Sequence, residues 1–134
     1  MKTVLQHISL NVSDLARSKA FYKEVLGYLG FHVKSEGKDY IGLGNGMTGI
    51  WLSEAEPDRK GKLHRKNPGV NHLAFRAESR EEVERFAEFL KEKGIPALYG
   101  SPRLFPEYGK DYYAVYFEDP DRLKLELVSG ESPS

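Results

Sequence analysis

The pattern of apolar and polar positions occurs twice along the chain. In the first half, residues 4–12 alternate between apolar and polar side chains, as expected for a strand with one buried face. Apolar residues then recur at helical spacing as far as about Leu26, where glycine follows. Short strands are expected near 31–35, 39–44 and 48–53. The first half is therefore predicted to contain a strand, a helix and three further strands.

The same order restarts after a polar connector. An alternating strand is expected at 70–77, an amphipathic helix follows, and further strands are expected near 96–99, 112–118 and 123–128. Neither half alone could cover both faces of its sheet. We therefore predict an α+β fold of two repeated βαβββ modules that form a curved, barrel-like mixed sheet with the helices outside.

Capping residues mark where both helices begin. Ser13 or Asp14 can accept a hydrogen bond from the free N–H groups of the first helix. Ser79, with Glu82 three positions later, has the spacing of a capping box for the second helix. Glycine closes each helical stretch, which gives both helices a predicted end as well as a predicted start.

The length of the chain, 134 residues, is sufficient for one domain with its own hydrophobic core. We expect a single domain over 1–134, with the first module at about 1–53 and the second at about 70–129. Between them, residues 54–69 are polar and charged and contain turn-forming proline and glycine, so this segment is expected to be a connector.

Charge and cysteine content exclude several classes of function. Twenty basic residues balance twenty acidic ones, and this balance predicts neither a nucleic-acid partner nor a membrane partner. The chain has no cysteine, so a thiolate nucleophile, a disulfide and a zinc–thiolate site are all excluded. An alternating pattern replaces the apolar run of a signal peptide near the N-terminus. A cytoplasmic location is therefore expected.

Each half of the chain carries a histidine at the same point of a repeated phrase. The first copy is Gln6–Val12 with His7, and the second is Asn71–Ala77 with His72. A repeat of this length is typical of two copies of one supersecondary module. Two-fold related modules bring equivalent positions together, which makes the two histidines candidates for a shared site.

The same alternation places an acidic side chain, Glu126, on the sheet face that carries these histidines. In the last predicted strand, leucines take the helix-packed face, so Glu126 points the opposite way, as His7 and His72 do. Two imidazoles and one carboxylate suit Fe(II), Mn(II), Co(II), Ni(II) or Zn(II) and leave coordination positions open. Solvent-facing side chains would give the same pattern, so both interpretations stay open at this level.

Residues 99–113 have the most unusual composition in the chain, with five aromatic residues in a proline-stiffened segment. We expect a lid over a small organic anion or ring, in which Arg103 clamps a carboxylate or phosphonate and Lys110 adds a point charge. Tyr108 and Tyr113 would line the same pocket. The alternative is a loop that its aromatic residues anchor, with both cations in solvent.

Five segments together resemble the vicinal oxygen chelate superfamily. They are Gln6–Leu15, Phe21–Gly27, Asn71–Phe75, Tyr116–Asp121 and Leu125–Leu127. This superfamily includes glyoxalase I, bleomycin-binding proteins, fosfomycin-resistance thiol transferases, methylmalonyl-CoA epimerase and extradiol dioxygenases. The resemblance covers nearly the whole chain. It implies the two-module fold and a metal site built from both modules, and it does not specify a reaction.

The resemblance implies roles for individual residues. His7, His72 and Glu126 match three of the four metal positions of the family, and the fourth is Trp51. An indole cannot donate a lone pair to a metal, which disfavours glyoxalase I and the epimerase. Trp51 is instead expected to form a pocket wall. Ser9 matches the hydroxyl or thiol residue found two positions after the first histidine in the fosfomycin-resistance transferases.

Arg122 departs from the family pattern, in which glycine usually follows the Asp-Pro-Asp turn. A left-handed backbone at this arginine would cost about 1 kcal/mol. We expect the turn to tolerate that cost, with Arg122 in solvent. The alternative is a charge at the edge of the site.

The leading hypothesis is a divalent-metal-dependent enzyme that acts on a small oxygen-chelating substrate, with lyase or thiol-transferase chemistry favoured. One ion of Zn, Mn, Ni, Co or Fe is implied, and no catalytic residue is assigned. The alternatives are a metal-free drug-sequestering protein of the bleomycin-resistance type and a single-domain extradiol dioxygenase. By resemblance the protein forms a homodimer, in which partner subunits can complete each site.

Overall fold

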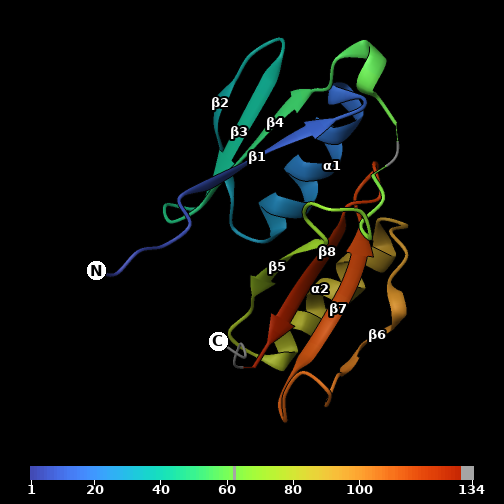
Figure 1. The fold of residues 1–134 in the computed structure, drawn as a ribbon. Coiled ribbons are helices and arrows are strands. Elements are labelled where there is room, and N and C mark those ends of the chain that lie inside the picture. Colours follow the sequence, from blue (N-terminus) through green and yellow to red (C-terminus); the bar gives the residue numbers. More distant parts are fainter. Residues whose placement is uncertain (62, 131–134) are drawn as a thin grey trace. The chain divides into compact units, whose positions relative to one another are not determined.

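The structure is a computed structural model that describes residues 1–61 and 63–130 (Figure 1). The chain divides into two compact units, Met1–Lys62 and Leu63–Ser134. Their boundary falls inside the predicted connector. In the described part of the chain, neither helix has the length and apolar composition that crossing a membrane requires.

The first unit is one βαβββ module followed by a short 3₁₀ turn. Its elements are β1 (His7–Val12), α1 (Leu15–Tyr28), β2 (His32–Glu36), β3 (Tyr40–Gly44), β4 (Gly49–Glu54) and η1 (Pro57–Arg59). The strands form one sheet in the order β1-β4-β3-β2. The β1–β4 pair is parallel and the other pairs are antiparallel.

The second unit repeats this topology. Its elements are β5 (His72–Arg76), α2 (Arg80–Glu92), β6 (Leu98–Leu104), β7 (Tyr113–Glu118) and β8 (Lys124–Ser129). The sheet order is β5-β8-β7-β6, again with a parallel pair, β5–β8, at one edge. The predicted α+β fold of two βαβββ modules is confirmed, and the strands are hydrogen-bonded into two separate four-stranded sheets.

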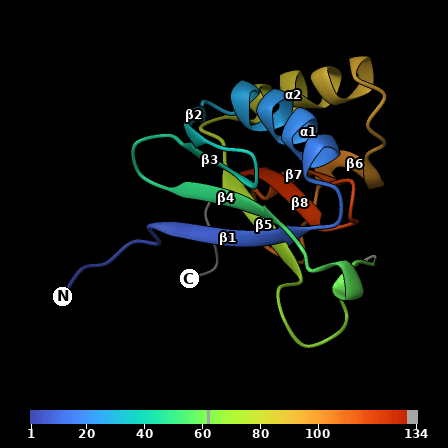
Figure 2. The same ribbon diagram turned by 90° about the horizontal axis from the view of Figure 1, so that it is seen from above.

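Each helix packs on its own sheet and builds the core of its module. α1 contacts β2, β3 and β4, and α2 contacts β6, β7 and β8 (Figure 1, Figure 2). The buried stripe of α1 includes Tyr22 and Leu26, and that of α2 includes Phe86 and Leu90. Burying each such side chain stabilises the fold by about 1.5–3 kcal/mol. In the second module, Phe105, Ala114, Tyr116 and Val128 form a further buried cluster.

Side-chain caps fix the helix starts. Asp14, rather than Ser13, caps α1, because its Oδ1 accepts a hydrogen bond from the Arg17 N–H at 3.1 Å. Ser79 caps α2 by accepting from the Glu82 N–H at 3.2 Å. These caps begin both helices at the positions predicted from the sequence.

The first part of the segment predicted to be a lid, residues 99–104, belongs to strand β6. β6 continues through Leu104, so the predicted strand near 96–99 is displaced and only residues 105–112 form a loop. Strand pairing was hard to predict here because Tyr99 (φ 60°) and Gly100 (φ 64°) are left-handed and the register with β7 shifts. The Ser101 hydroxyl bridges this irregularity: it donates to the Leu98 carbonyl at 2.6 Å and accepts from the Tyr116 N–H at 3.0 Å.

The turn between β7 and β8 has the backbone that the sequence predicted. Arg122 has a left-handed φ of 68°. Oδ1 of Asp119 accepts hydrogen bonds from the N–H groups of Asp121 and Leu123, both at 2.8 Å, and thereby holds the turn. The guanidinium of Arg122 lies 3.4 Å from a Glu118 carboxylate oxygen.

Candidate metal and substrate site

Strand alternation brings His72 and Glu126 together on the sheet face away from α2. β5 runs parallel to β8 with Ala74 opposite Glu126, so His72, two positions earlier, projects from the same face. The neighbours of Glu126, Leu125 and Leu127, are buried on the other face. Glu126 has 0% exposure, unlike an ordinary strand carboxylate at a surface.

The two oxygens of Glu126 have different surroundings. Oε2 accepts a hydrogen bond from the Tyr112 hydroxyl at 2.5 Å. Oε1 lies 3.1 Å from Nε2 of His72 and has no hydrogen-bond partner in the structure. A buried carboxylate oxygen without a partner costs about 1–3 kcal/mol or more. Such an atom indicates a missing positive partner.

The imidazole of His72 is oriented to offer Nε2. Its Nδ1 lies 2.8 Å from Oδ1 of Asn71, a contact that suits the tautomer with the proton on Nδ1 and the lone pair on Nε2. His7 in the first module has the same arrangement with Oε1 of Gln6, also at 2.8 Å. Each repeated phrase therefore supplies a histidine together with the amide side chain that fixes its tautomer.

The distance between the two donor atoms suits a shared cation. Two ligands at about 2.1 Å from one ion, separated by about 90–110°, lie roughly 3.0–3.4 Å from each other. Nε2 of His72 and Oε1 of Glu126 are 3.1 Å apart. Within residues 1–61 and 63–130, no group of three or more histidine or acidic side chains is placed to hold a metal ion. His72 and Glu126 form a pair that fits one ion.

A cavity of about 450 Å³ opens beside this pair. Aromatic and charged side chains line it: His72, Tyr99, Arg103, Phe105, Glu107, Tyr108, Tyr112, Tyr116 and Lys124. Two of the predicted pocket residues, Arg103 and Tyr108, are therefore in the cavity that contains His72. Its volume suits a small organic molecule.

Two phenols of the cavity are held in their neutral form. Burial, and then the hydrogen bond to Glu126, raises the pKa of Tyr112 to about 12. Burial and the negative charge of Glu126 also raise the pKa of Tyr116 above its ordinary value. Both hydroxyls are therefore hydrogen-bond donors at neutral pH.

A third phenol has the opposite electrostatic environment. Burial opposes ionisation of Tyr99, but hydrogen bonds from Arg65 and Lys124 outweigh it and lower the pKa of Tyr99. Nζ of Lys124 lies 3.4 Å from this hydroxyl, and 5.3 Å and 5.5 Å from the ring centroids of Tyr99 and Tyr116. Lys124 is thus a fixed positive charge on the strand position opposite His72.

Arg103 anchors its own segment. Its Nε donates to the Tyr99 carbonyl and its Nη1 donates to the Leu104 carbonyl, both at 3.0 Å. The guanidinium also lies 3.9 Å from the ring centroid of Phe105. These contacts hold the guanidinium at the cavity wall.

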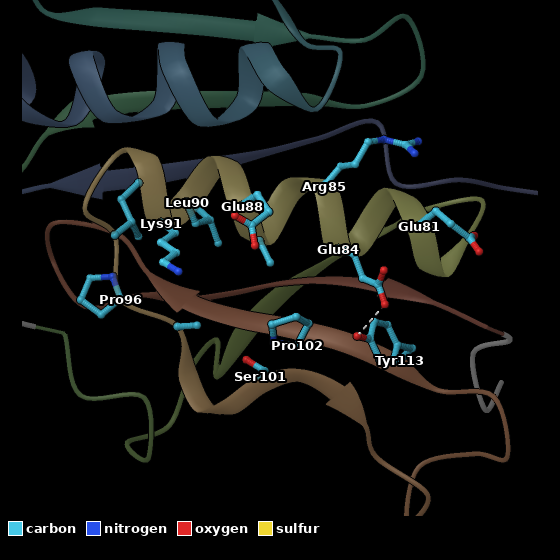
Figure 3. A pocket seen from close by; sticks show the side chains of 13 residues that line it. Glu81, Glu84, Arg85, Glu88, Leu90, Lys91, Pro96, Ser101, Pro102 and Tyr113 are labelled. Carbon is cyan, nitrogen blue, oxygen red and sulfur yellow. Dashed lines mark hydrogen bonds between the residues drawn. The ribbon is translucent and has the colours of Figure 1, made fainter.

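Lys110 and Tyr113 do not line the cavity beside His72. Lys110 lines a separate hollow of about 380 Å³ near the start of α2. Tyr113 projects toward α2, where its hydroxyl donates to Glu84 at 3.1 Å and its ring lies 4.2 Å from the Arg80 guanidinium (Figure 3). Tyr113 lies in the predicted strand near 112–118, whose alternation places it on the face opposite Tyr116.

The first module places Trp51 where the second has Glu126. In the parallel β1–β4 pair, Ser9 lies opposite Trp51, as Ala74 lies opposite Glu126. The indole stacks on Tyr40 with ring centroids 6.1 Å apart, and it covers Gly42, where an added Cβ would come within 2.5 Å of the ring. This register agrees with the sequence alignment that left the fourth metal position without a donor.

A further hollow of about 690 Å³ lies between α2 and β6 (Figure 3). Its lining includes Glu84, Glu88, Lys91 and Pro102. It contains none of the predicted metal ligands, and Tyr113 is the only predicted pocket residue among the residues that line it. The cavity beside His72 is therefore the better candidate for chemistry.

Comparison with known proteins identifies relatives of this chain. The family model of the Glyoxalase/Bleomycin resistance protein/Dioxygenase superfamily matches residues 4–127. The Bacillus subtilis protein YqjT is 37% identical over 132 residues, which cover 93% of this chain and 98% of that protein. The metallothiol transferase FosB of Staphylococcus epidermidis is 31% identical over 128 residues, with coverages of 96% and 82%. A crystal structure from Bacillus halodurans, provisionally named a glyoxalase, shares 38% identity with a TM-score of 0.85 and coverages of 94% and 95%.

Proposed function

Because this chain belongs to the Glyoxalase/Bleomycin resistance protein/Dioxygenase superfamily, we propose that it is a divalent-metal-dependent enzyme acting on a small oxygen-chelating substrate. Lyase or thiol-transferase chemistry is the favoured type. The observation that carries the proposal is the buried Oε1 of Glu126, which has no hydrogen-bond partner and lies 3.1 Å from Nε2 of His72.

The residues of the pair fit a divalent cation. A neutral imidazole and a carboxylate are ligands for Zn, Mn, Ni, Co and Fe, and the described residues offer no cysteine to favour a thiophilic ion. When bound, such an ion would act as a Lewis acid toward negative charge on a substrate oxygen. It would also give Oε1 of Glu126 the positive partner that it lacks.

His7 is proposed as the third ligand. The support for this assignment is the repeat, together with the matching hydrogen bond of each histidine to the amide side chain before it. Trp51 provides no donor at the fourth position, so the proposed ligand set leaves coordination positions open for substrate.

Side chains of the chain itself would bind and orient the substrate. Lys124 would place a positive charge on the cavity wall, next to the phenol of Tyr116, which interacts with Glu126. The aromatic rings of the cavity exclude water and strengthen these interactions. The similarity to metallothiol transferase FosB supports the transferase branch, with Ser9 as a further pocket residue.

A second candidate is supported by the aromatic lining of the cavity. Five aromatic side chains around about 450 Å³ could hold a planar molecule without a metal, as in the bleomycin-resistance branch. Ligand binding that survives a chelator unchanged would favour this candidate. Binding that the chelator abolishes would favour the enzyme.

The test is elemental analysis of freshly purified protein, followed by calorimetric titration with Mn(II), Co(II), Ni(II), Zn(II) and anaerobic Fe(II). We expect one ion per chain and loss of binding in His72→Ala. His32→Ala is the matched control, because His32 is an exposed histidine on β2. A protein that contains no metal and takes up none would contradict the proposal.

We also propose that the protein forms a homodimer. Light scattering at several protein concentrations tests it, and a concentration-independent monomer would contradict it.

A further inference from the structure

We propose that Tyr112 is a positioning residue that makes Glu126 a one-oxygen metal ligand. This inference rests on the proposed function, because it assigns a role within the same site. Neither the family resemblance nor the predicted pocket residues include Tyr112. Its role follows from the way the two carboxylate oxygens of Glu126 are divided between neighbours.

The two oxygens of the Glu126 carboxylate have different neighbours in the structure. The Tyr112 hydroxyl donates to Oε2 at 2.5 Å, while Oε1 faces Nε2 of His72 at 3.1 Å. Glu126 has 0% exposure, so bulk solvent does not compete for either oxygen. A carboxylate held in this way presents one oxygen to a cation beside His72 and keeps the other in a hydrogen bond.

The position of Tyr112 is fixed independently of Glu126. Its N–H donates to the Gly109 carbonyl at 3.3 Å, and its carbonyl accepts from the Phe105 N–H at 2.8 Å. Its ring makes an edge contact with Tyr108, with centroids 5.5 Å apart. The peptide before it rests against Gly130, where an added Cβ would lie 2.5 Å from the Asp111 carbonyl oxygen. The loop therefore sets the hydroxyl before any ligand binds.

The number of oxygens that Glu126 contributes has a chemical consequence. A carboxylate that binds through both oxygens occupies two coordination positions, whereas one that binds through a single oxygen leaves a position for substrate or water. The hydrogen bond from Tyr112 to Oε2 therefore bears on how many coordination positions remain open.

Tyr113 provides a matched control on the next residue. Its hydroxyl also donates to a glutamate, Glu84, at 3.1 Å, but it does so on the α2 side of the sheet. Tyr113→Phe thus removes a tyrosine–glutamate hydrogen bond without touching Glu126. Tyr112→Phe removes the corresponding bond at the proposed site and leaves the ring in place.

The experiment is titration of the full chain with Co(II), monitored by visible d–d absorption. In Tyr112→Phe, we expect Co(II) affinity to fall by about 10- to 100-fold, the usual effect of removing a partner of a metal ligand. We also expect the d–d bands to weaken and shift, because Glu126 can then bind through both oxygens and raise the coordination number. Tyr113→Phe should keep the wild-type spectrum and affinity.

The possible outcomes separate this inference from the proposed function. A wild-type protein that binds no Co(II) would overturn both. Wild-type binding with an unchanged spectrum and affinity in Tyr112→Phe would overturn the role of Tyr112 alone. An equal change in Tyr113→Phe would also overturn it, since a general loss of stability would then explain both variants. Thermal unfolding of the metal-free variants supplies that stability comparison.

Discussion

The two modules share a backbone plan and differ in one decisive side chain. Both have a parallel strand pair at one edge, and both place a histidine on its first strand. At the equivalent position of the partner strand, the first module has Trp51 and the second has Glu126. In one module the same register therefore yields an aromatic wall over Gly42, and in the other a buried carboxylate.

This difference shows that two copies of one fold can have different chemical roles. Backbone register fixes where a side chain projects, while the residue at that position decides what it can do there. Glu126 is buried beside Tyr112 and Tyr116, whose pKa values are raised by burial and by its charge. Trp51 packs on Tyr40 and needs no charged partner. The chemistry that the described residues support is concentrated in the second module.

The largest expected effect tests whether the two modules have equivalent cores. Leu26 on α1 is 0% exposed and Leu90 on α2 is 1% exposed. Leu26→Ala and Leu90→Ala should each lower the free energy of unfolding by about 2–5 kcal/mol, because each leaves a cavity. Denaturant unfolding measures both. A cost below about 1 kcal/mol in only one variant would show that the cores are not equivalent.

The next prediction tests whether the difference between Glu126 and Trp51 determines metal binding. Glu126→Gln keeps the size of the side chain and removes its charge, so metal affinity should fall by more than about 100-fold. Trp51→Phe should change metal affinity less than about two-fold, because an indole is no ligand. Calorimetric titration measures both. Equal losses in the two variants would contradict the assignment of Glu126 as the ligand.

Helix caps give a smaller and symmetrical effect. Asp14→Ala and Ser79→Ala each leave a helix N–H without its side-chain acceptor. We expect each to lower the free energy of unfolding by about 1 kcal/mol. Thermal or denaturant unfolding is the measurement, with Met47→Ala as an exposed control at 72% exposure. No loss in either cap variant would contradict the cap assignments.

The smallest effect is spectroscopic and separates two phenols of one cavity. The chain has eight tyrosines, and the pKa of Tyr112 is raised to about 12 while that of Tyr99 is lowered. In ultraviolet titration of phenolate absorbance, Tyr112→Phe should remove a tyrosine that ionises at high pH. Tyr99→Phe should remove a tyrosine that ionises at lower pH. Loss of the same component in both variants would contradict the opposite shifts.

The raised pKa of Tyr112 also predicts how the stability of the folded protein changes with pH. The folded protein holds this proton more tightly than the unfolded chain does, since the pKa rises from 10.0 to about 12 on folding. The resulting stabilisation is complete below about pH 10 and is lost as the pH rises toward 12. Alkaline unfolding of Tyr112→Phe, compared with the wild-type protein, measures this contribution.

Much of the fold could be predicted from the sequence because its two periods are clear. Strict alternation placed Glu126 and His72 away from the helix-packed faces, and the structure has them side by side at 3.1 Å. The assignment of His7, His72 and Glu126 as one ligand set stays a prediction. The amide before each histidine, Gln6 or Asn71, was visible in the repeat, and its hydrogen bond to the imidazole became clear only in the structure.

The site residues that were missed lie where alternation was obscured. Tyr99 and Gly100 have left-handed backbone, so the continuation of β6 through Leu104 was not predicted, and Tyr112 was not assigned to the site. A signal was nonetheless present. Counting back from the turn at Asp119 pairs Tyr116 with Glu126, and Tyr112 lies four residues earlier on the same face.

The irregular outer strands have one more consequence. β2 and β6 each end a sheet, and both carry a register shift in their pairing, between Val33 and Ser35 and between Leu98 and Arg103. A straight, regular edge strand would offer a row of unpaired backbone N–H and C=O groups to another polypeptide chain. The register shifts of β2 and β6 disrupt such a template at these two edges, so neither edge is well suited to pair with another chain.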